Sequence, residues 1–396
     1  MAKAGNVQLG NAKKEKKDEF YTQLADINAE LRHYTHHFAG KVVFCNCDDP
    51  YESNFFKYFA ANFNALKLKR LIATCYAGSP VAGRQLELFD WGEDEKTGLT
   101  GLSGLSESSN PANLVGPLKN EKPRVPHKIV INEVKDVNGD GRIDLADVEW
   151  LIKNDKNVLT KLEGDGDFRS AECIALLKEA DIVVTNPPFS LFREYVAQLV
   201  QYGKKFLIIG NKQAIKYKEI FPLIRDDKLW LGYTPTSREI YFDVPQSFID
   251  TALSLNKDRT IVTHAGRLMA RSSSIWYTNL EHKKRHEEYV FVRRYTPEDY
   301  PHYANYDAID VSESKFIPED WDGMLGVPIT FLDKYNPEQF EIIGIAEGDS
   351  GRELGLNPIP KELKKINPSL RDGQLYLMKD GKPVKPFSRI IIRRKT

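Results

Sequence analysis

The sequence predicts a doubly wound α/β sheet of the Rossmann type, and two observations favour this fold class. Apolar runs of strand length alternate with helical patterns of about ten residues. The first three elements, a strand at 41–46, a helix at 52–66 and a strand at 69–76, have the order of a βαβ unit, which requires parallel strands. Ligands of such sheets bind beyond the carboxyl ends of the strands, so side chains that directly follow a strand are the first candidates for a functional site.

The alternation resumes after a break. From residue 171 the expected order is helix, strand, helix, strand, helix and strand, over 171–180, 181–186, 190–202, 204–211, 215–224 and 228–233. Beyond Thr234 an aromatic-rich sequence without a regular period indicates a mixed α+β region. We therefore divide the chain into a basic tail (1–17), an α/β domain (18–76 and 160–235), an insertion (77–159) and a C-terminal region (236–396).

Composition limits the classes of function. Lys plus Arg equals Asp plus Glu at 56 each, so binding to a polyanion must come from local segregation of charge. No apolar run approaches the roughly 20 residues that a bilayer span needs, and the first residues lack the apolar core of a signal peptide. We expect a cytoplasmic monomer without a membrane segment. The four cysteines are expected to be reduced core thiols, with metal binding as the alternative.

The sequence Asn186-Pro187-Pro188-Phe189 follows an apolar strand directly. Two prolines fix φ and remove two backbone donors, so the turn is stiff. The side-chain carbonyl of Asn186 and the backbone carbonyl of Pro187 can accept both hydrogens of an exocyclic ring amine, which makes its nitrogen a better nucleophile. Phe189 can stack on the ring, a contact worth about 1–3 kcal/mol. The pattern predicts group transfer to a base amine; the alternative is a plain Pro-Pro turn with Ser190 as the next helix N-cap.

This turn resembles the [D/N]-P-P-[Y/F] signature of amino-group methyltransferases that use S-adenosylmethionine. By itself the signature does not separate DNA adenine enzymes from RNA or protein methyltransferases. The stretch "DEFYTQ" (18–23) resembles the F-x-T-P element with which DNA adenine methyltransferases close over the methionine part of the cofactor. Phe20, Tyr21 and Thr22 carry that match, while Gln23 replaces the proline.

The stretch "GDGDFRS" (164–170) resembles a second cofactor element of these enzymes. The resemblance implies that Asp167 accepts a hydrogen bond from the cofactor's adenine amine and that Phe168 packs against its ring. The alternative for Asp167 is an exposed carboxylate in a glycine-rich turn.

Longer phrases resemble the EcoRI-type adenine-specific DNA methyltransferase family, among them "VVFCNCDDP", "KKFLIIGN", "YDAIDV" and "GVPITFLDKYNPEQFE". The resemblance covers most of 18–76, 162–233 and 275–345, and that family shares the glycine-free turn after the first strand. It implies methylation of the adenine N6 amine within a short sequence of double-stranded DNA, with S-adenosyl-L-methionine as donor, in a restriction-modification or orphan role. It also makes Asn46 and Asp48 candidates for the cofactor's amino-acid end or ribose. We expect the mixed α+β C-terminal region (236–396) to be the target-recognition region.

The insertion contains "DVNGDGRIDLADVEW" (136–150), which resembles an EF-hand or dockerin calcium loop. Gly141 permits the sharp turn at the sixth position, and Asp147 replaces the usual bidentate Glu at the twelfth. The pattern predicts a structural Ca²⁺ ion; the alternative is an Asx-rich loop that holds itself without a metal. The expected ligands are Asp136, Asn138, Asp140, Arg142 through its carbonyl, Asp144 and Asp147.

Basic and aromatic residues interleave in "EHKKRHEEYVFVRRYTPEDY" (281–300). Basic side chains supply phosphate contacts that do not depend on sequence, so this segment is our candidate for DNA binding; a solvated charged face is the alternative. The candidate residues are Lys283, Lys284, Arg285, Arg293 and Arg294.

Two other functions stay open. An RNA or protein amino-group methyltransferase would use the same Asn-Pro-Pro-Phe turn. A DNA-binding module without catalysis is the other, because the first strand lacks a glycine-rich turn after it and the second lacks an acidic residue at its end. The combined motifs favour a site-specific DNA adenine methyltransferase.

Overall fold

The computed structural model describes residues 21–47, 53–75, 126–137, 139–141, 145–154, 158–243, 249–250, 253, 261–264 and 266–395. The chain divides into two compact units. Unit 1 comprises Met1–Asn28, Phe38–Ser190 and Tyr241–Ser272, and unit 2 comprises Ala29–His37, Leu191–Ile240 and Ser273–Thr396. Within the described ranges, no helix combines the length and the apolar character needed to cross a membrane.

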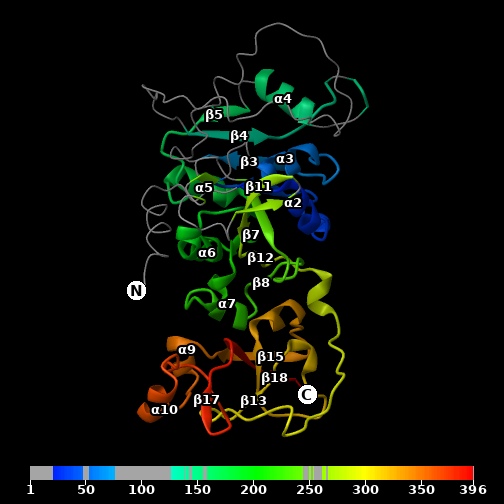
Figure 1. The fold of residues 1–396 in the computed structure, drawn as a ribbon. Helices are drawn as coiled ribbons and strands as arrows, with labels where there is room; N and C mark the ends of the chain where they lie inside the picture. Colours follow the sequence, from blue (N-terminus) through cyan, green and yellow to red (C-terminus); the bar gives the residue numbers. More distant parts are fainter. Residues whose placement is uncertain are drawn as a thin grey trace. The chain divides into compact units, whose positions relative to one another are not determined.

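Unit 1 contains five neighbouring strands of one sheet (Figure 1). β2 pairs in parallel with both β3 and β6, whereas β4 runs antiparallel to β3 and to β5. β2 and β6 are buried along their whole length, as their unbroken apolar sequences predict. The order is β5 (Leu159–Lys161), β4 (His127–Ile131), β3 (Arg70–Thr74), β2 (Val42–Cys45) and β6 (Ile182–Thr185).

Helices cover both faces of these strands. α3 (Asn54–Ala61) lies on one side and α5 (Ala171–Glu179) on the other (Figure 1). The Ser53 hydroxyl accepts hydrogen bonds from the backbone N–H groups at the start of α3, and Ser170 does the same for α5. Together with the parallel β3, β2 and β6, this arrangement gives unit 1 the mixed α/β architecture that the alternating pattern predicts.

The predicted insertion (77–159) contributes β4 and the first residue of β5 to the sheet. This differs from the expectation that the α/β domain continues only from residue 160. The sequence 128–134 predicts a strand within the insertion, and β4 overlaps it; β4 alternates buried and half-buried residues and lacks the apolar run of the central strands, so its place in the sheet was not predicted. Cys75, directly after β3, and His127, the first residue of β4, are bonded to each other. The Cys75 N–H donates to the His127 carbonyl at 3.1 Å, and the His127 N–H donates to Cys75 Sγ at 3.2 Å. The sequence 145–154 has the pattern of a helix that leaves the calcium-like loop, and it forms α4 (Leu145–Asn154).

A second sheet brings distant segments together in unit 1. Its order is β1 (Tyr21–Thr22), β9 (Ile240–Asp243), β11 (Arg267–Ser272) and β10 (Ile261–His264). β1 and β9 are antiparallel, and Thr22 lies opposite Phe242. The described residues between 241 and 272 therefore cluster with the α/β core, although they lie in the range that we assigned to the C-terminal region.

Unit 2 contains three strands in the order β7 (Lys205–Asn211), β12 (Ser274–Thr278) and β8 (Trp230–Leu231). β12 is antiparallel to both neighbours, so β7 and β8 run parallel to each other. α6 (Phe192–Gln201) packs on β7 through Phe192. A Cβ atom at Gly210 would lie 2.4 Å from the Phe192 ring, so this close packing requires glycine.

The predicted helix 215–224 is wrong as a single element. The structure has a 3-10 turn, η4 (Lys212–Lys216), and a separate short helix, α7 (Phe221–Arg225). Pro222 stands in the first turn of α7, where its missing N–H costs nothing, and it cannot continue a helix from before that point.

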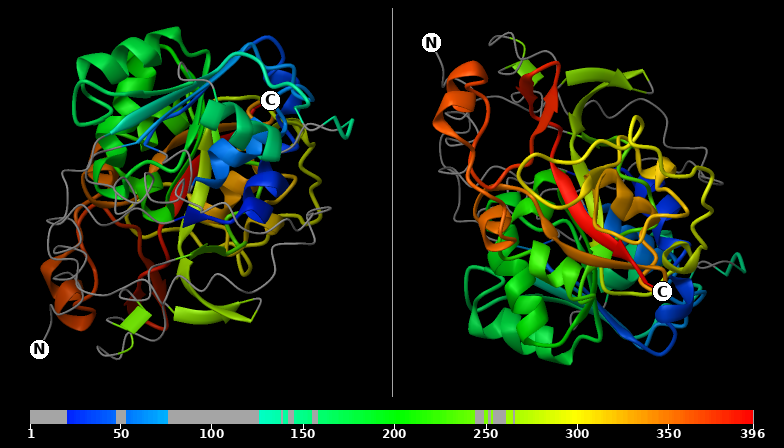
Figure 2. Two further views of the ribbon diagram at one scale, coloured as in Figure 1. Left: turned by 90° about the horizontal axis from the view of Figure 1, so that it is seen from above. Right: turned by 90° about the horizontal axis from the view of Figure 1, so that it is seen from below.

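The C-terminal part of unit 2 contains both strands and short helices. Its larger sheet has the order β13 (Ile309–Asp310), β14 (Leu325–Pro328), β18 (Arg389–Arg394) and β15 (Phe340–Ile345). Figure 2 shows β18 in red beside β15 in orange. A buried ion pair between Arg389 and Asp310, with Nε and Oδ1 2.8 Å apart, ties two strands of this region.

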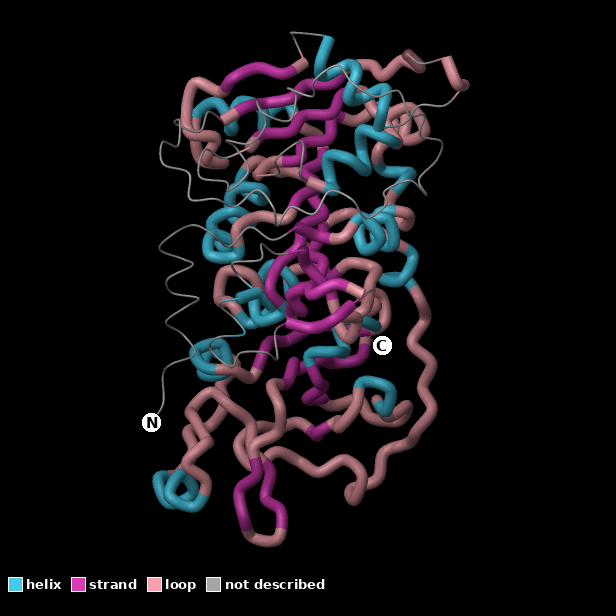
Figure 3. The backbone as a smooth tube through the Cα atoms, turned by 45° about the horizontal axis from the view of Figure 1, so that its top comes forward, coloured by secondary structure: helices cyan, strands magenta, loops and turns pink. Residues whose placement is uncertain are grey.

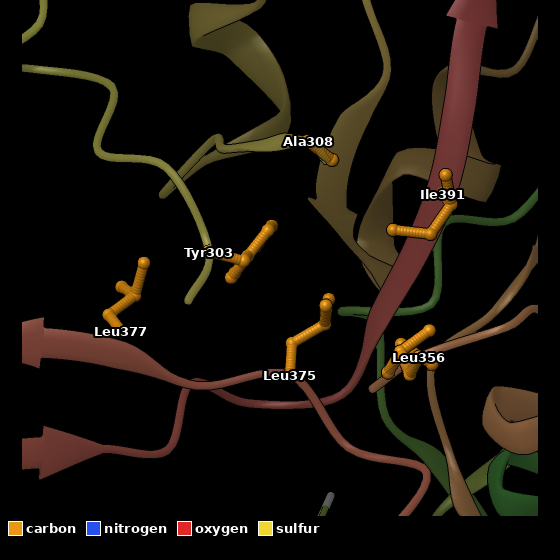
Figure 4. Close-up of a cluster of buried hydrophobic side chains, with 7 residues drawn as sticks. Tyr303, Ala308, Leu356, Leu375, Leu377 and Ile391 are labelled. Carbon is orange, nitrogen blue, oxygen red and sulfur yellow. The ribbon is translucent and has the colours of Figure 1, made fainter. Parts of the chain in front are cut away.

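A separate two-stranded hairpin, β16 (Leu377–Lys379) and β17 (Lys382–Val384), extends from unit 2 with its turn at the free end (Figure 3). A buried cluster that includes Tyr303, Leu375 and Ile391 joins the base of this hairpin to β18 (Figure 4). The remaining described elements are α2 (Leu24–Leu31), η1 (Thr35–His37), η3 (Phe189–Leu191), η6 (Lys283–His286), η7 (Ser314–Phe316), η8 (Ile329–Lys334), α9 (Gly348–Glu353) and α10 (Lys361–Ile366).

Candidate active site

Three polar residues meet at the carboxyl ends of the parallel strands β3, β2 and β6. Thr74, Asn46 and Thr185 are all completely buried. The Thr74 hydroxyl donates to Asn46 Oδ1 at 3.0 Å, and the Thr185 hydroxyl donates to the Asn46 backbone carbonyl. We call these three residues the strand-end network. β3 and β6 flank β2 on opposite sides, and doubly wound sheets bind ligands at the carboxyl ends of strands arranged in this way.

The sequence singled out Asn46 but missed Thr74 and Thr185. Each threonine is the last residue of an apolar strand, in "RLIAT" and "IVVT". A polar residue that ends a buried strand was the available signal, and it went unused because β-branched threonine also suits strands on its own.

Two buried polar groups near these strand ends lack a hydrogen-bond partner within the described ranges. They are Asn46 Nδ2 and the Thr22 hydroxyl, the latter in a residue that is only 3% exposed. Leaving such groups without a partner costs about 1–3 kcal/mol each. A bound molecule with polar atoms would satisfy them, so these residues fit a polar ligand.

Thr22 is held in place from two directions. Its backbone carbonyl accepts a hydrogen bond from Asn54 Nδ2 at 2.7 Å, at the start of α3. Gln23, where the family element has proline, donates from Nε2 to Asp243 Oδ2 at 2.6 Å. Tyr21 pairs through its backbone with Asp243. Phe20 lies outside the described residues, as does Asp48.

The Asn-Pro-Pro-Phe turn follows β6 directly, as predicted. Asn186, Pro188 and Phe189 are half-buried and Pro187 is buried, so the turn borders the core while remaining partly open. The Phe189 ring lies 6.3 Å from the Phe242 ring, centroid to centroid. Because Phe242 is opposite Thr22 in the sheet, this contact brings the turn and β1 to the same part of unit 1.

The alternative interpretation of this turn required Ser190 as the N-cap of the next helix. The N-cap of α6 is Leu191, which makes no side-chain cap hydrogen bond. A 3-10 turn, η3, separates the prolines from α6 instead. Ser190 is therefore not the N-cap of α6, and that part of the alternative is wrong. Phe242 was not singled out from the sequence, because nothing in "IYFD" connects it to a turn more than fifty residues earlier.

Asp167 and Phe168 precede α5. Phe168 is buried, with 2% of its surface exposed. The Asp167 carboxylate is half-buried and accepts from Arg169, from Nε at 2.9 Å and from Nη2 at 2.7 Å. Asp167 is thus a half-buried carboxylate that is paired with Arg169, which differs from the exposed loop residue of the alternative.

None of the four cysteines is in a disulfide, and Cys45, Cys75 and Cys173 are buried, as expected of core thiols. Cys47 is only half-buried and departs from that expectation. Burial raises the pKa of the Cys173 thiol, which also lies within hydrogen-bonding reach of Ser170 and Thr74. Cys173 therefore stays protonated at neutral pH and extends the polar surroundings of the strand-end network toward α5.

The calcium-like loop is only partly described. The Asp136 carboxylate accepts from the Gly139 N–H at 2.7 Å and from the Gly141 N–H at 2.8 Å. Asp147 is buried and accepts from the Val137 N–H at 2.8 Å. Among the residues that the structure describes, Asp140 included, no three His, Cys, Asp or Glu side chains are grouped closely enough to hold a metal ion. Three expected ligands lie outside those residues: Asn138, Arg142 and Asp144.

Arg285 departs from its expected role in DNA binding. It is 5% exposed, and its guanidinium pairs with Asp227 at 2.9 Å and with Glu281 at 3.1 Å. It also lies 3.7 Å from the centroid of the Trp230 ring. A buried, doubly paired guanidinium that covers an indole stabilises the fold and is not available to a phosphate. The interleaved sequence hid this because periodicity does not show which basic residues point inward.

The other basic candidates remain near the surface. Lys283, Arg293 and Arg294 are exposed, and Lys284 is half-buried with its Nζ 3.1 Å from the Tyr233 carbonyl. Arg293 covers the Phe316 ring at 3.8 Å. Lys283 and Arg294 therefore keep the accessibility that a phosphate contact requires.

Comparison with known proteins agrees with this geometry. The profile of the family described as "Adenine-specific methyltransferase EcoRI" matches residues 8–395. The chain is 42% identical to the Type II methyltransferase M.EcoRI of Escherichia coli over 356 residues, which are 89% of this chain and 94% of that protein. It is 36% identical to the Type II methyltransferase M.MpnI of Mycoplasma pneumoniae over 338 residues, 85% of this chain and 84% of the relative.

A third relative is the Type II methyltransferase M.MgeORF184P of Mycoplasma genitalium, 33% identical over 339 residues, with 85% of each chain covered. No solved structure matches the chain. The family profile spans nearly the whole sequence, and the relatives align over most of their own lengths. The chain therefore belongs to the EcoRI family of adenine-specific DNA methyltransferases.

Proposed function

We propose that the turn 186–189 holds the exocyclic N6 amine of an adenine that has been flipped out of double-stranded DNA. Flipping costs a few kcal/mol and gives access to a base edge that the duplex hides. The observation that carries this proposal is the position of the turn, which follows the buried strand β6 and adjoins the strand-end network.

Each residue of the turn has its own part in the proposal. The Asn186 side-chain carbonyl and the Pro187 backbone carbonyl accept the two amine hydrogens, and this draws the nitrogen lone pair away from the ring. Pro188 stiffens the turn, so the two acceptors keep their spacing. Phe189 stacks on the base, supported by its neighbour Phe242.

The family uses S-adenosylmethionine, which supplies an electrophilic methyl group when bound. We propose that Thr22 and Asn46 hold its polar end, because each has a buried donor without a partner among the described residues. Asp167 and Phe168 are assigned to its adenine end, where the Arg169 ion pair would have to share the carboxylate. Phe20, Tyr21 and Asp48 stay in the proposal on their resemblance alone.

Transfer of tritium from methyl-labelled S-adenosylmethionine tests the function. Duplex DNA, RNA and a protein extract are offered separately, and sequencing of methylated DNA then locates modified adenine. We expect label in DNA alone, at N6 of adenine within a short recurring sequence. Label in RNA or protein but not in DNA would favour the rival methyltransferase, and absence of cofactor binding by calorimetry would favour a DNA-binding module without catalysis.

We also propose that the loop 136–147 holds a structural Ca²⁺ ion. Supporting it, Asp136 and Asp147, the first and twelfth positions, both bond to backbone N–H groups of the same loop. Melting with Ca²⁺ and with a chelator tests this, with Asp136→Asn as the variant. We expect Ca²⁺ to raise the melting temperature of the wild type only. Equal melting temperatures with Ca²⁺ and with chelator would favour the alternative, a loop stabilised by its own hydrogen bonds without a metal. We further propose that the protein is a cytoplasmic monomer.

A further inference from the structure

Residues 359–388, which we call the C-terminal module, form an ordered unit with a small core of their own. Ile359, Leu370 and Tyr376 are buried together, with Leu363 packed against them. The module is fastened to the rest of unit 2 through Asn305, whose Nδ2 donates to the Gln374 carbonyl at 2.9 Å. Its backbone position is therefore set by packing within unit 2.

Positive charge is concentrated in this module although the whole chain is neutral. The module has seven Lys or Arg residues and three Asp or Glu residues, which gives a net charge of +4. Lys364 is paired with Asp372, Nζ to Oδ2, at 2.8 Å. Five further lysines are exposed, and none has an ion-pair partner within the described ranges: Lys361, Lys365, Lys379, Lys382 and Lys385.

Four of these lysines form two pairs of neighbouring like charges. Lys379 and Lys382 are direct cross-strand partners in the β16–β17 hairpin, on either side of the tight turn at Asp380 and Gly381. Lys361 and Lys365 are four residues apart in α10 and so share one helical face. Like charges in both arrangements destabilise the free protein. An anionic partner that lies along the module would remove this repulsion.

The module also carries the most exposed aromatic ring of the described chain. Phe387 is 90% exposed, whereas the other phenylalanines in the described ranges are buried or half-buried. Its backbone stands two residues before β18, and the side-chain hydroxyl of the next residue, Ser388, accepts a hydrogen bond from Lys216 Nζ at 2.7 Å. An exposed ring beside unpaired lysines fits a partner with both phosphates and apolar surface.

Helix α10 and the hairpin are joined, so their charges act as one surface. Asn367, at the end of α10, donates from Nδ2 to the Pro383 carbonyl in β17 at 3.1 Å. The hairpin is a separate two-stranded sheet that extends from unit 2 (Figure 3). A two-stranded ribbon has the width that the major groove of B-DNA admits.

We propose that the C-terminal module is a contact surface for duplex DNA, with the β16–β17 hairpin entering a groove and the module's unpaired lysines neutralising phosphates. Lys379 and Lys382 sit at the hairpin tip, and Phe387 makes the apolar contact. This inference rests on the proposed function, since the substrate supplies the DNA. It places DNA contacts in a segment different from the one that the interleaved sequence 281–300 suggested.

The double variant Lys379→Gln with Lys382→Gln tests the proposal. Its binding to a fluorescein-labelled duplex oligonucleotide is measured by anisotropy over a range of salt concentrations. The matched control is Lys41→Gln with Lys69→Gln, two exposed lysines at the amino ends of β2 and β3, away from the carboxyl-end site. Melting temperature and size-exclusion elution are measured for every protein.

We expect the hairpin variant to bind DNA about tenfold more weakly at moderate salt, and its plot of log K against log salt to be shallower by about 1.8. Its melting temperature should equal or exceed that of the wild type, because a like-charge pair has been removed. The control should keep the wild-type slope. Phe387→Ala should weaken binding without changing the slope, since no charge is lost.

Wild-type affinity and slope in the hairpin variant would overturn the inference, as would an equal loss in the control. A change in elution without a change in DNA binding would assign the surface to self-association instead. Methyl transfer to DNA by the wild type distinguishes failure of this inference from failure of the proposed function. If the wild type methylates DNA and the hairpin variant binds DNA as the wild type does, only this inference is refuted. A wild-type chain that neither binds nor methylates DNA refutes both.

Discussion

The Thr185 hydroxyl donates a hydrogen bond to the backbone carbonyl of Asn46, and both residues are completely buried. This contact joins the end of β6 to the end of β2. Thr185 is also the residue immediately before Asn186, so the bond fixes the proposed amine acceptor relative to the strand that carries a proposed cofactor ligand. This hydroxyl thus adds a side-chain bond to the backbone pairing of β2 and β6 at the point where the candidate site begins.

Replacement of Thr185 by Val should reduce both stability and turnover. The Asn46 carbonyl would lose a buried donor, at a cost of about 1–3 kcal/mol in the free energy of unfolding. Thr185→Ser keeps the hydroxyl and should restore kcat, at a smaller cost for the lost methyl group. Denaturant unfolding and steady-state kinetics check this; a valine variant with wild-type kcat would show that the bond has no positioning role.

The Asn186→Ala variant should lose about 10²–10³-fold in kcat, since one of the two amine acceptors disappears. Affinity for S-adenosylmethionine should change little, because the proposed cofactor ligands lie on other segments. Calorimetry for the cofactor and tritium transfer for the rate measure the two quantities separately. Unaltered turnover would remove Asn186 from the catalytic site.

The Thr22→Val variant should have opposite effects on folding and on binding. Without cofactor, the Thr22 hydroxyl is buried and has no partner in the described chain, so its removal should leave the melting temperature equal or slightly higher. With S-adenosylmethionine, the same change should weaken binding about five- to tenfold, as expected for one lost hydrogen bond. A variant that melts earlier and binds the cofactor normally would make Thr22 a purely structural residue.

Stability should fall with acid partly because of His282. Burial lowers the pKa of this imidazole from 6.5 to about 4, and Nε2 is hydrogen-bonded to the Leu231 carbonyl at 3.0 Å. Because the folded pKa is the lower one, the unfolded chain takes up a proton first as the pH falls. The folded state therefore loses up to about 3 kcal/mol between pH 6.5 and pH 4.

The His282→Gln variant should show a shallower fall in unfolding free energy across that window. Denaturant unfolding at several pH values measures it, with pH 8 as the baseline where His282 is neutral in both states. Parallel curves for wild type and variant from pH 8 to pH 4 would contradict the assignment.

The central elements were predictable because their sequences have a single dominant pattern. The strand predicted at 41–46 is β2 (Val42–Cys45), and the strand predicted at 181–186 is β6 (Ile182–Thr185). Both are short apolar runs buried on both faces, where periodicity and composition agree. The Asn-Pro-Pro-Phe turn could be placed at a strand end for the same reason.

Contacts between distant segments were not predictable from local pattern. Nothing around Phe242 indicates that it pairs with Thr22 or touches Phe189, because register between strands far apart in sequence leaves no periodic signal. Arg285 shows the same limit for charge, since its burial depends on Trp230 and on two carboxylates from other elements. The sequence placed the Asn-Pro-Pro-Phe turn after its strand, but it did not show which distant residues contact the turn.

The hydrogen bonds between Cys75 and His127 have a consequence for how this protein tolerates change in length. The chain departs from the sheet at Cys75 and returns at His127, and the two residues bond directly to each other. Whatever lies between them joins two points that are already adjacent, so the strands need not move when its length differs. Closing a longer connection costs only about 0.6 kcal/mol for each doubling. This position is therefore suited to evolutionary insertion and to engineered cargo, with the sheet and its strand-end network left in register.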